Sequence, residues 1–412
     1  MRFFNALLPA LFTLANAAAI EKEDSKYELY DAIIVGGGPA GLAALSGLAR
    51  VRRNVLLIDS GEYRNAPTRH MHDVLGFDGV TPAYFRWAAR KQLSYYDTVS
   101  MTNGTVTKVV PRMNNTRFEV TKLHNGKEKI LTARKVVLAT GLRDILPKTP
   151  GIEENWGKGI FWCPWCDGHE HADQPLGLLA PLDEVPGMVR EMLTLNKDII
   201  AFVNGTDTET IRVLAENKTV DYETYLDIHN VKVDNRTIKE IKRLKDGSDD
   251  EDANPSLPSV AEFDEFSVEF AKGLAVKRAA FFASFPSEQR STVGEDLGVY
   301  LYKGRLAADQ AAGLSTNIAG VYAIGDANSD NVTNVPHALF SGKRTAVYLH
   351  VRLERENAAE EIAAAKDGND EAKREFDLDE TAHLPRDEEV RSLWERMNED
   401  PRDVLYAGEF DQ

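Results

Sequence analysis

The chain contains two cysteines, three positions apart in the motif Cys163-Pro-Trp-Cys166. A disulfide across so short a segment closes a small loop and adds little to the stability of a fold. The thiolate is the attacking species in thiol–disulfide exchange, and a C-x-x-C arrangement can lower the pKa of one thiol. The pair therefore predicts redox chemistry, with Cys163 and Cys166 as the reacting residues.

Two other uses of this segment stay open from the sequence alone. One is a purely structural disulfide. The other is a zinc site, because His169 and His171 extend the motif to C-x-x-C-x-x-H-x-H. Structural zinc sites usually take their second pair of ligands from a more distant segment, so we prefer the redox interpretation and expect no metal.

A glycine-rich turn near the start of the chain predicts a dinucleotide site. Gly36, Gly38 and Gly41 have the spacing G-x-G-x-x-G and lie between an expected strand (29–35) and an expected helix (42–49). Such glycines allow a tight turn, close approach of the backbone to a pyrophosphate, and close packing of helix on strand. Asp59 ends the next apolar run, where a carboxylate can accept a hydrogen bond from a ribose hydroxyl.

The elements around these motifs predict an α/β protein built from two Rossmann-like units. The strand–helix–strand order of residues 29–58 predicts a parallel sheet, and residues 135–139 and 320–324 read as further strands. Between those two segments, residues 175–204 repeat a weaker strand–helix–strand pattern. This order indicates a smaller α/β domain inserted into a discontinuous first domain.

Two segments on either side of the C-x-x-C motif carry a family resemblance. They are Val136-Val-Leu-Ala-Thr140-Gly141 and Gly320-Val-Tyr-Ala-Ile-Gly325-Asp326. In order and spacing the chain resembles the flavoprotein disulfide reductases, specifically the low-molecular-weight thioredoxin reductase type. The resemblance implies FAD as the cofactor, with Thr140 and Gly141 in the turn that closes the first FAD segment. It places the Asp326 carboxylate, after Gly325, on the ribityl chain of the flavin.

The same resemblance implies roles around the cysteine pair. It implies that Cys166 lies next to the flavin, that Cys163 exchanges with substrate, and that Asp167 is the acid/base residue beside the pair. A homodimer is also implied by the resemblance.

The inserted segment departs from that family. Where the family has a second G-x-G-x-x-[GA] for NADPH, this chain has Gly177-Leu-Leu-Ala-Pro-Leu182, and Pro181 removes a backbone donor. The following Val203-Asn-Gly-Thr-Asp-Thr-Glu209 offers acidic residues and no arginine to a 2′-phosphate. We therefore expect that NADPH binding is lost and that molecular oxygen accepts the electrons.

A dithiol flavoprotein without NADPH is similar to the fungal gliotoxin-type dithiol oxidases, which close disulfides in small natural products. Residues 63–72 and 334–344 also resemble that subgroup. The resemblance implies a small-molecule or peptide dithiol as substrate and peroxide as product. His337 is the first candidate for a base that takes a proton from a substrate thiol, with His70 and His72 as alternatives.

Two other functions remain open. One is an NADPH-dependent disulfide reductase with an unusual nucleotide site. The other is a flavin-containing protein that binds or sequesters thiols without turnover.

The motifs divide the chain into five expected segments. These are a signal peptide (1–17), a first FAD-binding part (28–150), an inserted NADPH-domain-like part with the C-x-x-C motif (151–274), a second FAD-binding part (275–355) and an acidic C-terminal extension (356–412).

Charge and the N-terminus bear on partners and location. The formal net charge of −16 argues against nucleic acid as a partner. An apolar run (3–14) after Arg2, followed by Ala15-Asn16-Ala17, reads as a secretory signal that is too short to span a membrane. We therefore expect a secreted or lumenal protein that is not embedded in a membrane. The N-x-S/T sequons also favour this location: Asn103, Asn114, Asn204, Asn217, Asn235 and Asn331.

Overall fold

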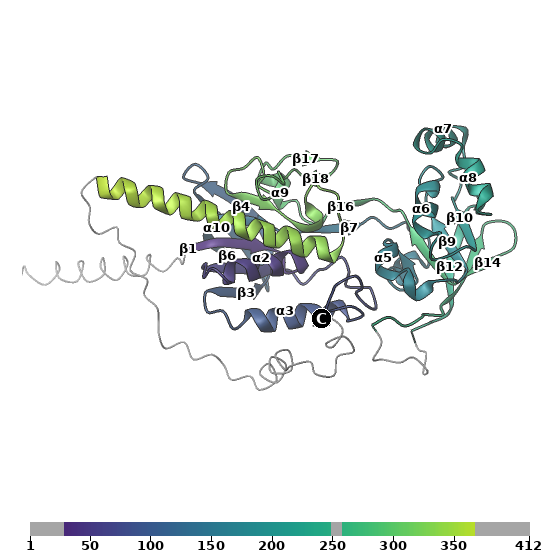
Figure 1. Ribbon diagram of the computed structural model, residues 1–412, viewed down its shortest axis with the longest axis horizontal. Coiled ribbons are helices and arrows are strands. Elements are labelled where there is room, and N and C mark those ends of the chain that lie inside the picture. Colours follow the sequence, from purple (N-terminus) through teal and green to yellow (C-terminus); the bar gives the residue numbers. More distant parts are fainter. Residues whose placement is uncertain (1–28, 249–257, 367–412) are drawn as a thin grey trace, which may run out of the picture.

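The computed structural model describes residues 29–248 and 258–366, which form two α/β units side by side (Figure 1). The expected signal peptide, residues 249–257 and the extension beyond Lys366 lie outside the described residues.

The first unit is built on a seven-stranded sheet in the order β3-β2-β1-β6-β5-β4, with β19 paired to β6. Strands β1, β2, β3, β6 and β19 pair in parallel, whereas β4, β5 and β6 pair antiparallel. The strands are β1 (Leu29–Val35), β2 (Val55–Asp59), β3 (Val99–Asn103), β4 (Thr105–Arg112), β5 (Arg117–His124), β6 (Lys127–Leu138) and β19 (Val321–Ala323).

The register of this sheet brings three of the predicted motifs to one edge. Val35 lies opposite Leu138, and Leu138 lies opposite Ala323. Because the three strands are parallel, the turns that follow them leave the sheet at the same end. The expected α/β class with a parallel sheet is confirmed.

Helices cover both faces of this sheet. They are α2 (Pro39–Ala49), α3 (Pro82–Leu93), α9 (Val293–Asp296), α10 (Val335–Lys366) and the 3₁₀ helix η2 (Gly325–Ala327). The long helix α10 packs on α2, and its Ala346, Leu349 and Leu353 are buried in the same core. This helix continues through Glu356, which accepts from Lys135 at 2.7 Å. The expected break at residue 356 is therefore inside a helix that ends at Lys366.

The second unit has a parallel sheet in the order β11-β10-β9-β15-β8 and a small antiparallel sheet in the order β12-β13-β14. The strands are β8 (Ile160–Phe161), β9 (Leu176–Leu179), β10 (Ile199–Phe202), β11 (Lys232–Asp234), β12 (Ile238–Lys245), β13 (Glu265–Phe270), β14 (Val276–Arg278) and β15 (Ala280–Ala283). The helices are α4 (Ile152–Asn155), α5 (Pro164–Asp167), η1 (His169–His171), α6 (Val185–Met192), α7 (Glu209–Lys218) and α8 (Tyr222–Ile228).

Two antiparallel strands connect the units, β7 (Leu142–Asp144) and β16 (Ser287–Gln289). The inserted unit is therefore longer than the expected 151–274, because β15 pairs with β9 and β8 within its sheet. An apolar run such as residues 280–283 does not reveal which of two sheets it joins, and the sequence assigned it to the wrong one. A short hairpin of β17 (Leu301–Tyr302) and β18 (Arg305–Leu306) completes the first unit.

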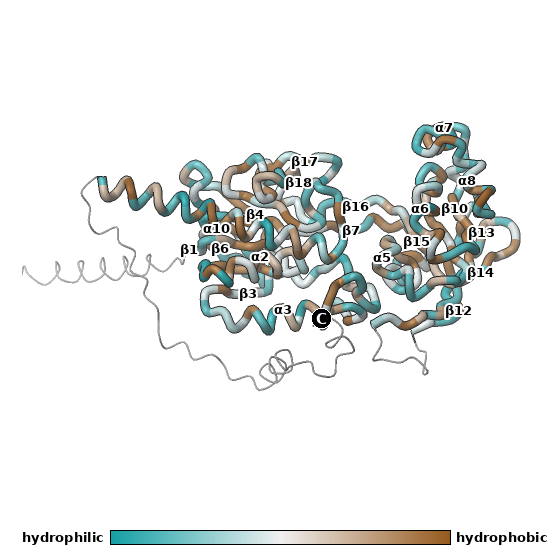
Figure 2. Tube along the Cα trace, viewed as in Figure 1, coloured by the Kyte–Doolittle hydropathy of each residue, from teal (hydrophilic) through white to brown (hydrophobic). Residues whose placement is uncertain are grey.

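Hydrophobic residues concentrate on the strands and inner helix faces of both units (Figure 2). Over residues 29–248 and 258–366, no helix combines the length and apolar character needed to cross a membrane.

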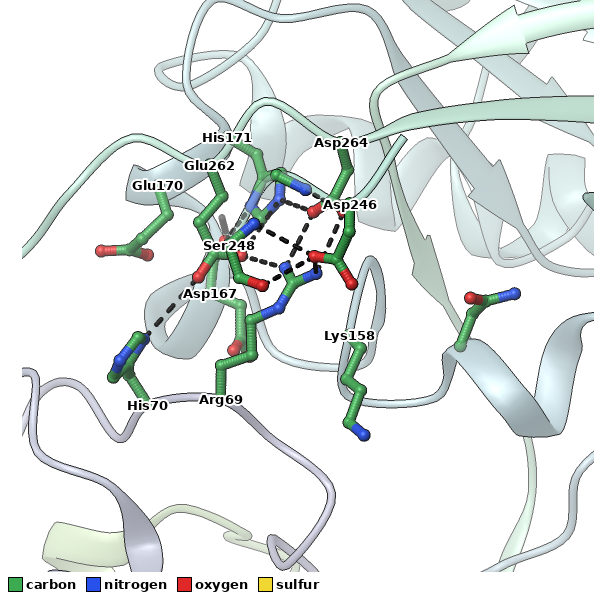
Figure 3. Close-up of polar contacts among 12 residues, drawn as sticks. Arg69, His70, Lys158, Asp167, Glu170, His171, Asp246, Ser248, Glu262 and Asp264 are labelled. Atoms are coloured by element: carbon green, nitrogen blue, oxygen red, sulfur yellow. Dashed lines mark hydrogen bonds and ion pairs between the residues drawn. The ribbon is translucent and has the colours of Figure 1, made fainter. Parts of the chain in front are cut away.

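A cluster of buried charges joins the two units through Arg69, which lies between β2 and α3 of the first unit (Figure 3). Its guanidinium contacts three carboxylates of the inserted unit: Glu262, Asp264 at 2.8 and 3.0 Å, and Asp246 at 2.7 Å. Asp264 is fully buried and is also bound by Arg243. Carboxylates removed from water need such partners, so Arg69 holds the units together at this point.

The pKa values of these acids reflect the same contacts. Burial alone would raise the pKa of Asp264, but hydrogen bonds from His171 and Arg69 outweigh it and lower the pKa. For Glu262, burial is likewise outweighed by His70 and by the charge of Arg69. Both acids therefore stay ionised in the folded protein.

We predict that Arg69→Met destabilises the protein by about 3 kcal/mol, the usual cost of removing one partner of a buried ion pair. Thermal unfolding at neutral pH measures this as a lower Tm. Arg112→Met is the matched control, because Arg112 forms an exposed pair with Glu119 and should leave the Tm unchanged.

The difference between wild type and Arg69→Met should also depend on pH. A lowered carboxyl pKa adds stability above the ordinary value of about 4, and this stability is lost as the pH falls through the folded-state pKa. The Tm difference should therefore be largest near neutral pH and shrink below about pH 4. A difference independent of pH would contradict the ionic origin of the effect.

Candidate functional site

A cavity of about 620 Å³ lies where the three parallel strands end, and both units line it. This volume is within the range of about 300–1,000 Å³ that is usual for cofactor and ligand sites. Nine of the predicted site residues line it: Gly36, Gly38, Asp59, Thr140, Gly141, Cys166, Asp167, Gly325 and Asp326. Gly41, Cys163 and His337 are not part of this lining.

The turn after β1 has the conformation that its glycines predict. Gly36 has a φ of +113°, and a Cβ there would lie 2.3 Å from the carbonyl oxygen of Ala139. A Cβ on Gly41 would lie 2.0 Å from the carbonyl oxygen of Gly36. Gly41 thus lets α2 begin directly against the turn, behind the cavity wall.

The start of α2 is suited to an anionic group. Gly38 is its N-cap and has no side chain to satisfy the first backbone N–H groups of the helix. A Cβ on Gly38 would meet nothing within 4 Å, so open space faces the helix end. Free N–H groups and the helix dipole favour a phosphate at such a position.

Thr140 supplies a second sign that a ligand belongs here. Its hydroxyl oxygen is buried and has no hydrogen-bond partner, although buried polar groups are nearly always paired. The residue lines the cavity in the turn after β6. The unpaired hydroxyl, the helix end and the cavity volume fit a dinucleotide such as FAD.

Asp59 lies at the expected end of β2 but already has three donors. Its carboxylate accepts from the Tyr63 hydroxyl at 2.5 Å and from the Gly61 N–H at 3.0 Å, and it contacts Arg90. These contacts hold the carboxylate beside the cavity, where it could accept from a ribose hydroxyl.

Asp326 is tied to Arg64, a residue of the 63–72 segment that resembles the dithiol oxidase subgroup. Arg64 bridges Asp326 at 3.0 Å and Asp144 at 2.6 Å, and its guanidinium lies 5.6 Å from the ring centre of Trp162. Burial raises the pKa of Asp326, and the charge of Arg64 opposes that shift. Arg64 therefore connects the second FAD segment, strand β7 and the residue before Cys163.

The cysteines form a disulfide at the start of the short helix α5. Cys166 faces the cavity, while Trp165 between the two cysteines is 67% exposed. The pair therefore has one sulfur toward the cofactor cavity and an exposed aromatic side chain toward solvent. Such an arrangement can pass electrons from a substrate outside to a cofactor inside.

Asp167 is buried directly after Cys166. Burial raises the pKa of its carboxyl well above the ordinary value, and the charges of Glu170 and Glu262 raise it further. Its Oδ2 atom is buried without a hydrogen-bond partner. A neutral carboxyl at this place can donate a proton to a neighbouring sulfur.

The histidines are arranged differently from the sequence expectation. The ring of His337 pairs with Asp330 at 2.6 Å, while its neighbours Pro336 and Ala338 face the cavity. His70 and His72 both line the cavity near Cys166. The first candidate for the base is thus engaged elsewhere, because the start of α10 directs its side chain to Asp330.

The zinc alternative does not match this geometry. The two cysteines are bonded to each other, and the His171 ring faces the carbonyl oxygen of Asp167 and the Asp264 carboxylate. His171, Glu262 and Asp264 have ligand-type atoms within 4.8 Å of one another. The Arg69 guanidinium already binds the two carboxylates, so this cluster needs no metal ion to balance their charge.

Sequence reasoning singled out residues 63–72 as a segment but gave no individual role to Tyr63, Arg64 or Arg69, and it missed Arg90. All but Arg90 lie in the polar stretch that follows Asp59, and the length of that stretch before α3 was the available signal. The partners of Arg64 lie 80 and 262 positions away in the sequence, so no local pattern specifies them.

We predict that Gly38→Ala lowers FAD affinity at least about tenfold, or 1.4 kcal/mol, because the new methyl group enters the space before the helix end. The fold should persist, since Gly38 has a φ of −74° and no close neighbour. The FAD dissociation constant and the apoprotein Tm are the measurements. Gly187→Ala, in α6 of the other unit, is the control and should keep full FAD affinity. Unchanged affinity in Gly38→Ala would contradict the placement of the pyrophosphate.

Comparisons with known proteins agree with this geometry. A family model described as pyridine nucleotide-disulphide oxidoreductase matches residues 30–185. The "Probable thioredoxin reductase" of Arthroderma benhamiae is 45% identical over 376 residues, which cover 89% of this chain and 91% of the relative. The "Thioredoxin reductase aclD" of Aspergillus oryzae is 31% identical and covers 65% of this chain and 86% of the relative.

A solved structure shows the same fold. The crystal structure of HlmI is 32% identical, with a TM-score of 0.67, and covers 82% of this chain and 97% of that chain. These similarities extend over both units and over the C-x-x-C segment. The chain belongs to the thioredoxin reductase-like family of FAD-dependent pyridine nucleotide-disulphide oxidoreductases, and it is a thiol/disulfide oxidoreductase.

Proposed function

We propose that this protein is an FAD-dependent dithiol oxidase that forms a disulfide in a small-molecule or peptide dithiol and passes the electrons to molecular oxygen. The observation that carries the proposal is the turn after β9. In a nucleotide-binding unit this turn would receive the pyrophosphate of NADPH. In this chain buried side chains fill it.

Two buried side chains and one hydrogen bond in this turn support the loss of NADPH binding. Ala180 and Leu182 are buried in the core of the inserted unit. The Leu182 N–H donates to the Thr206 hydroxyl at 3.1 Å, so it is not free for a phosphate. These contacts leave the turn without the open backbone donors that a pyrophosphate requires.

The charge at the start of α6 points the same way. Asp183 and Glu184 precede this helix, and Lys218 binds both carboxylates. The helix dipole is therefore already complemented by two acids, and an added phosphate would meet like charge. An electron acceptor other than NADP is consistent with this arrangement.

The cysteines account for the first half of the reaction. A substrate thiolate attacks Cys163, the S–S bond breaks, and Cys166 leaves as a thiolate that Asp167 can protonate. The second substrate thiolate then attacks the mixed disulfide, which releases the oxidised substrate and a reduced Cys163–Cys166 pair. The reduced pair would give its two electrons to bound FAD, whose chemistry would pass them to molecular oxygen and form hydrogen peroxide.

An NADPH-dependent disulfide reductase is the second candidate. The names of the relatives from Arthroderma benhamiae and Aspergillus oryzae favour it. The filled turn after β9 argues against it.

A homodimer is carried forward as part of the proposal. Helix α10 exposes Phe340, Val347, Tyr348 and Val351, which recur at helical spacing along one stripe. An apolar stripe on a long surface helix suits a second copy of the chain.

A secretory location also remains a proposal, which the exposure of all six sequon asparagines supports.

We predict that an anaerobic titration with a simple dithiol bleaches the flavin absorbance, and that air restores it with formation of peroxide. NADPH at the same concentration should leave the flavin oxidised. Absorbance at the flavin maximum and a peroxide assay are the measurements. Rapid bleaching by NADPH would instead identify a reductase.

Substitution of either cysteine should abolish turnover, but the two variants should differ. Cys163→Ser keeps the Cys166 thiol in the cavity, so we expect a long-wavelength absorbance from its thiolate beside the flavin. Cys166→Ser should lack this band, because Cys163 is not in the cavity lining. The absorbance spectra of the two variants between neutral and alkaline pH measure the difference. The band in the opposite variant would reverse the assigned roles.

A further inference from the structure

A row of titratable side chains connects the interior next to Cys166 with the protein surface. We propose that Glu170 and His72 carry protons between Asp167, beside the cysteine pair, and solvent at Asp78. This proposal rests on the dithiol oxidase function proposed above and adds the residues that handle its protons.

The reaction can use such a path. When the reduced pair returns to the disulfide, two S–H bonds break and one S–S bond forms, which releases two electrons and two protons. FAD, when bound, would accept the electrons, and any proton that the reduced flavin does not take up starts beside a buried carboxyl. Such a proton needs titratable groups to reach water.

The first three members of the row are buried or nearly so, and the last is exposed to solvent. Asp167 and Glu170 are 7% and 6% exposed, the His72 side chain is 10% exposed, and the Asp78 side chain is 43% exposed. Glu170 lies three positions after Asp167 on the continuous turn of α5 and η1, and its charge acts on the Asp167 pKa. The row is therefore buried at Asp167 and exposed to solvent at Asp78.

His72 connects the two ends. Its Nε2 lies 3.4 Å from Glu170 Oε1, and its Nδ1 lies 3.5 Å from Asp78 Oδ1. An imidazole with one nitrogen toward each carboxylate can accept a proton on one side and release it on the other. His72 also lines the same cavity as Cys166 and Asp167.

The neighbouring charges leave this row available. Ser259 donates to Glu170 Oε1 at 2.5 Å and holds that carboxylate in place. Arg69 neutralises Glu262 and Asp264, and the ring of His171 is committed to Asp264. These groups are engaged with one another, whereas the ion pairs of the described residues include no guanidinium contact for Glu170 or His72.

Two other histidines are less suited to the task. His70 lines the cavity, but its ring faces Glu262 at 3.7 Å, a carboxylate that Arg69 already binds (Figure 3). Its side chain is half exposed and lacks a second carboxylate on the buried side. His337 is paired with Asp330. His229, the C-cap of α8 in the inserted unit, is not part of the cavity lining and provides the control.

The test compares His72→Asn with His229→Asn in the full-length, FAD-loaded protein. Dithiol-driven flavin reduction is followed anaerobically across a pH range. His72→Asn should slow this step by about 100-fold, the usual contribution of a positioned acid–base group, and added imidazole should restore it. His229→Asn should behave like wild type. Unslowed reduction in His72→Asn, or slowed reduction that imidazole does not restore, would overturn the proposal.

A second measurement does not depend on flavin turnover. Acid quenching and mass spectrometry of the free cysteines during dithiothreitol treatment follow how fast the Cys163–Cys166 disulfide opens. Opening should be slower in His72→Asn, because the leaving Cys166 thiolate receives its proton from Asp167 along this path, and should stay unchanged in His229→Asn. Unslowed opening in His72→Asn counts against the path. If dithiols fail to reduce the wild-type flavin, the oxidase function fails while this measurement still judges the path.

Glu170→Gln examines the same path if His72→Asn misfolds, as judged by circular dichroism and FAD content. Glutamine keeps an acceptor for the Ser259 hydroxyl but cannot carry a proton. We expect the same slowing of flavin reduction without rescue by imidazole. A wild-type rate in Glu170→Gln would overturn the path as well.

Discussion

The site depends first on the parallel pairing of β1, β6 and β19. Val35, Leu138 and Ala323 lie side by side, so the turns after them emerge at one edge of the sheet although they are separated by more than a hundred positions. The free helix end at Gly38, the unpaired Thr140 hydroxyl and the Asp326 carboxylate all follow from this register. A shift of any one strand would separate the groups that fit the cofactor.

The cysteine pair reaches this edge from a different unit, and buried charge determines how. Asp264 and Glu262 would be costly to bury alone, and Arg69 from the first unit neutralises them. Arg64 makes a similar link between Asp326 and Asp144, next to the strands that connect the units. Both arginines come from the loop after β2, so one loop positions the inserted unit and completes the cavity wall.

Local patterns in the sequence predicted the parts of the fold that local patterns can specify. The glycine spacing at Gly36–Gly41, the apolar runs of β1, β2, β9 and β10, and the C-x-x-C motif all have short-range physical causes, and each was located within a few residues. From the sequence we assigned residues 280–283 to the wrong unit, because the residues of a buried strand do not specify which strand it pairs with. The orientation of His337 and the partners of Arg64 and Arg69 depend on contacts between distant segments, which composition and periodicity do not encode.

The turn after β9 has an evolutionary consequence. Ala180 and Leu182 are part of a core, and the Leu182 N–H is already bonded to Thr206. Restoring a glycine-rich turn would need several simultaneous replacements, and the change at Leu182 alone would leave a cavity that costs about 2–5 kcal/mol. Single substitutions from this sequence therefore pass through a destabilised intermediate. On the proposed function, the packing of this turn therefore opposes a return to nucleotide binding by single substitutions.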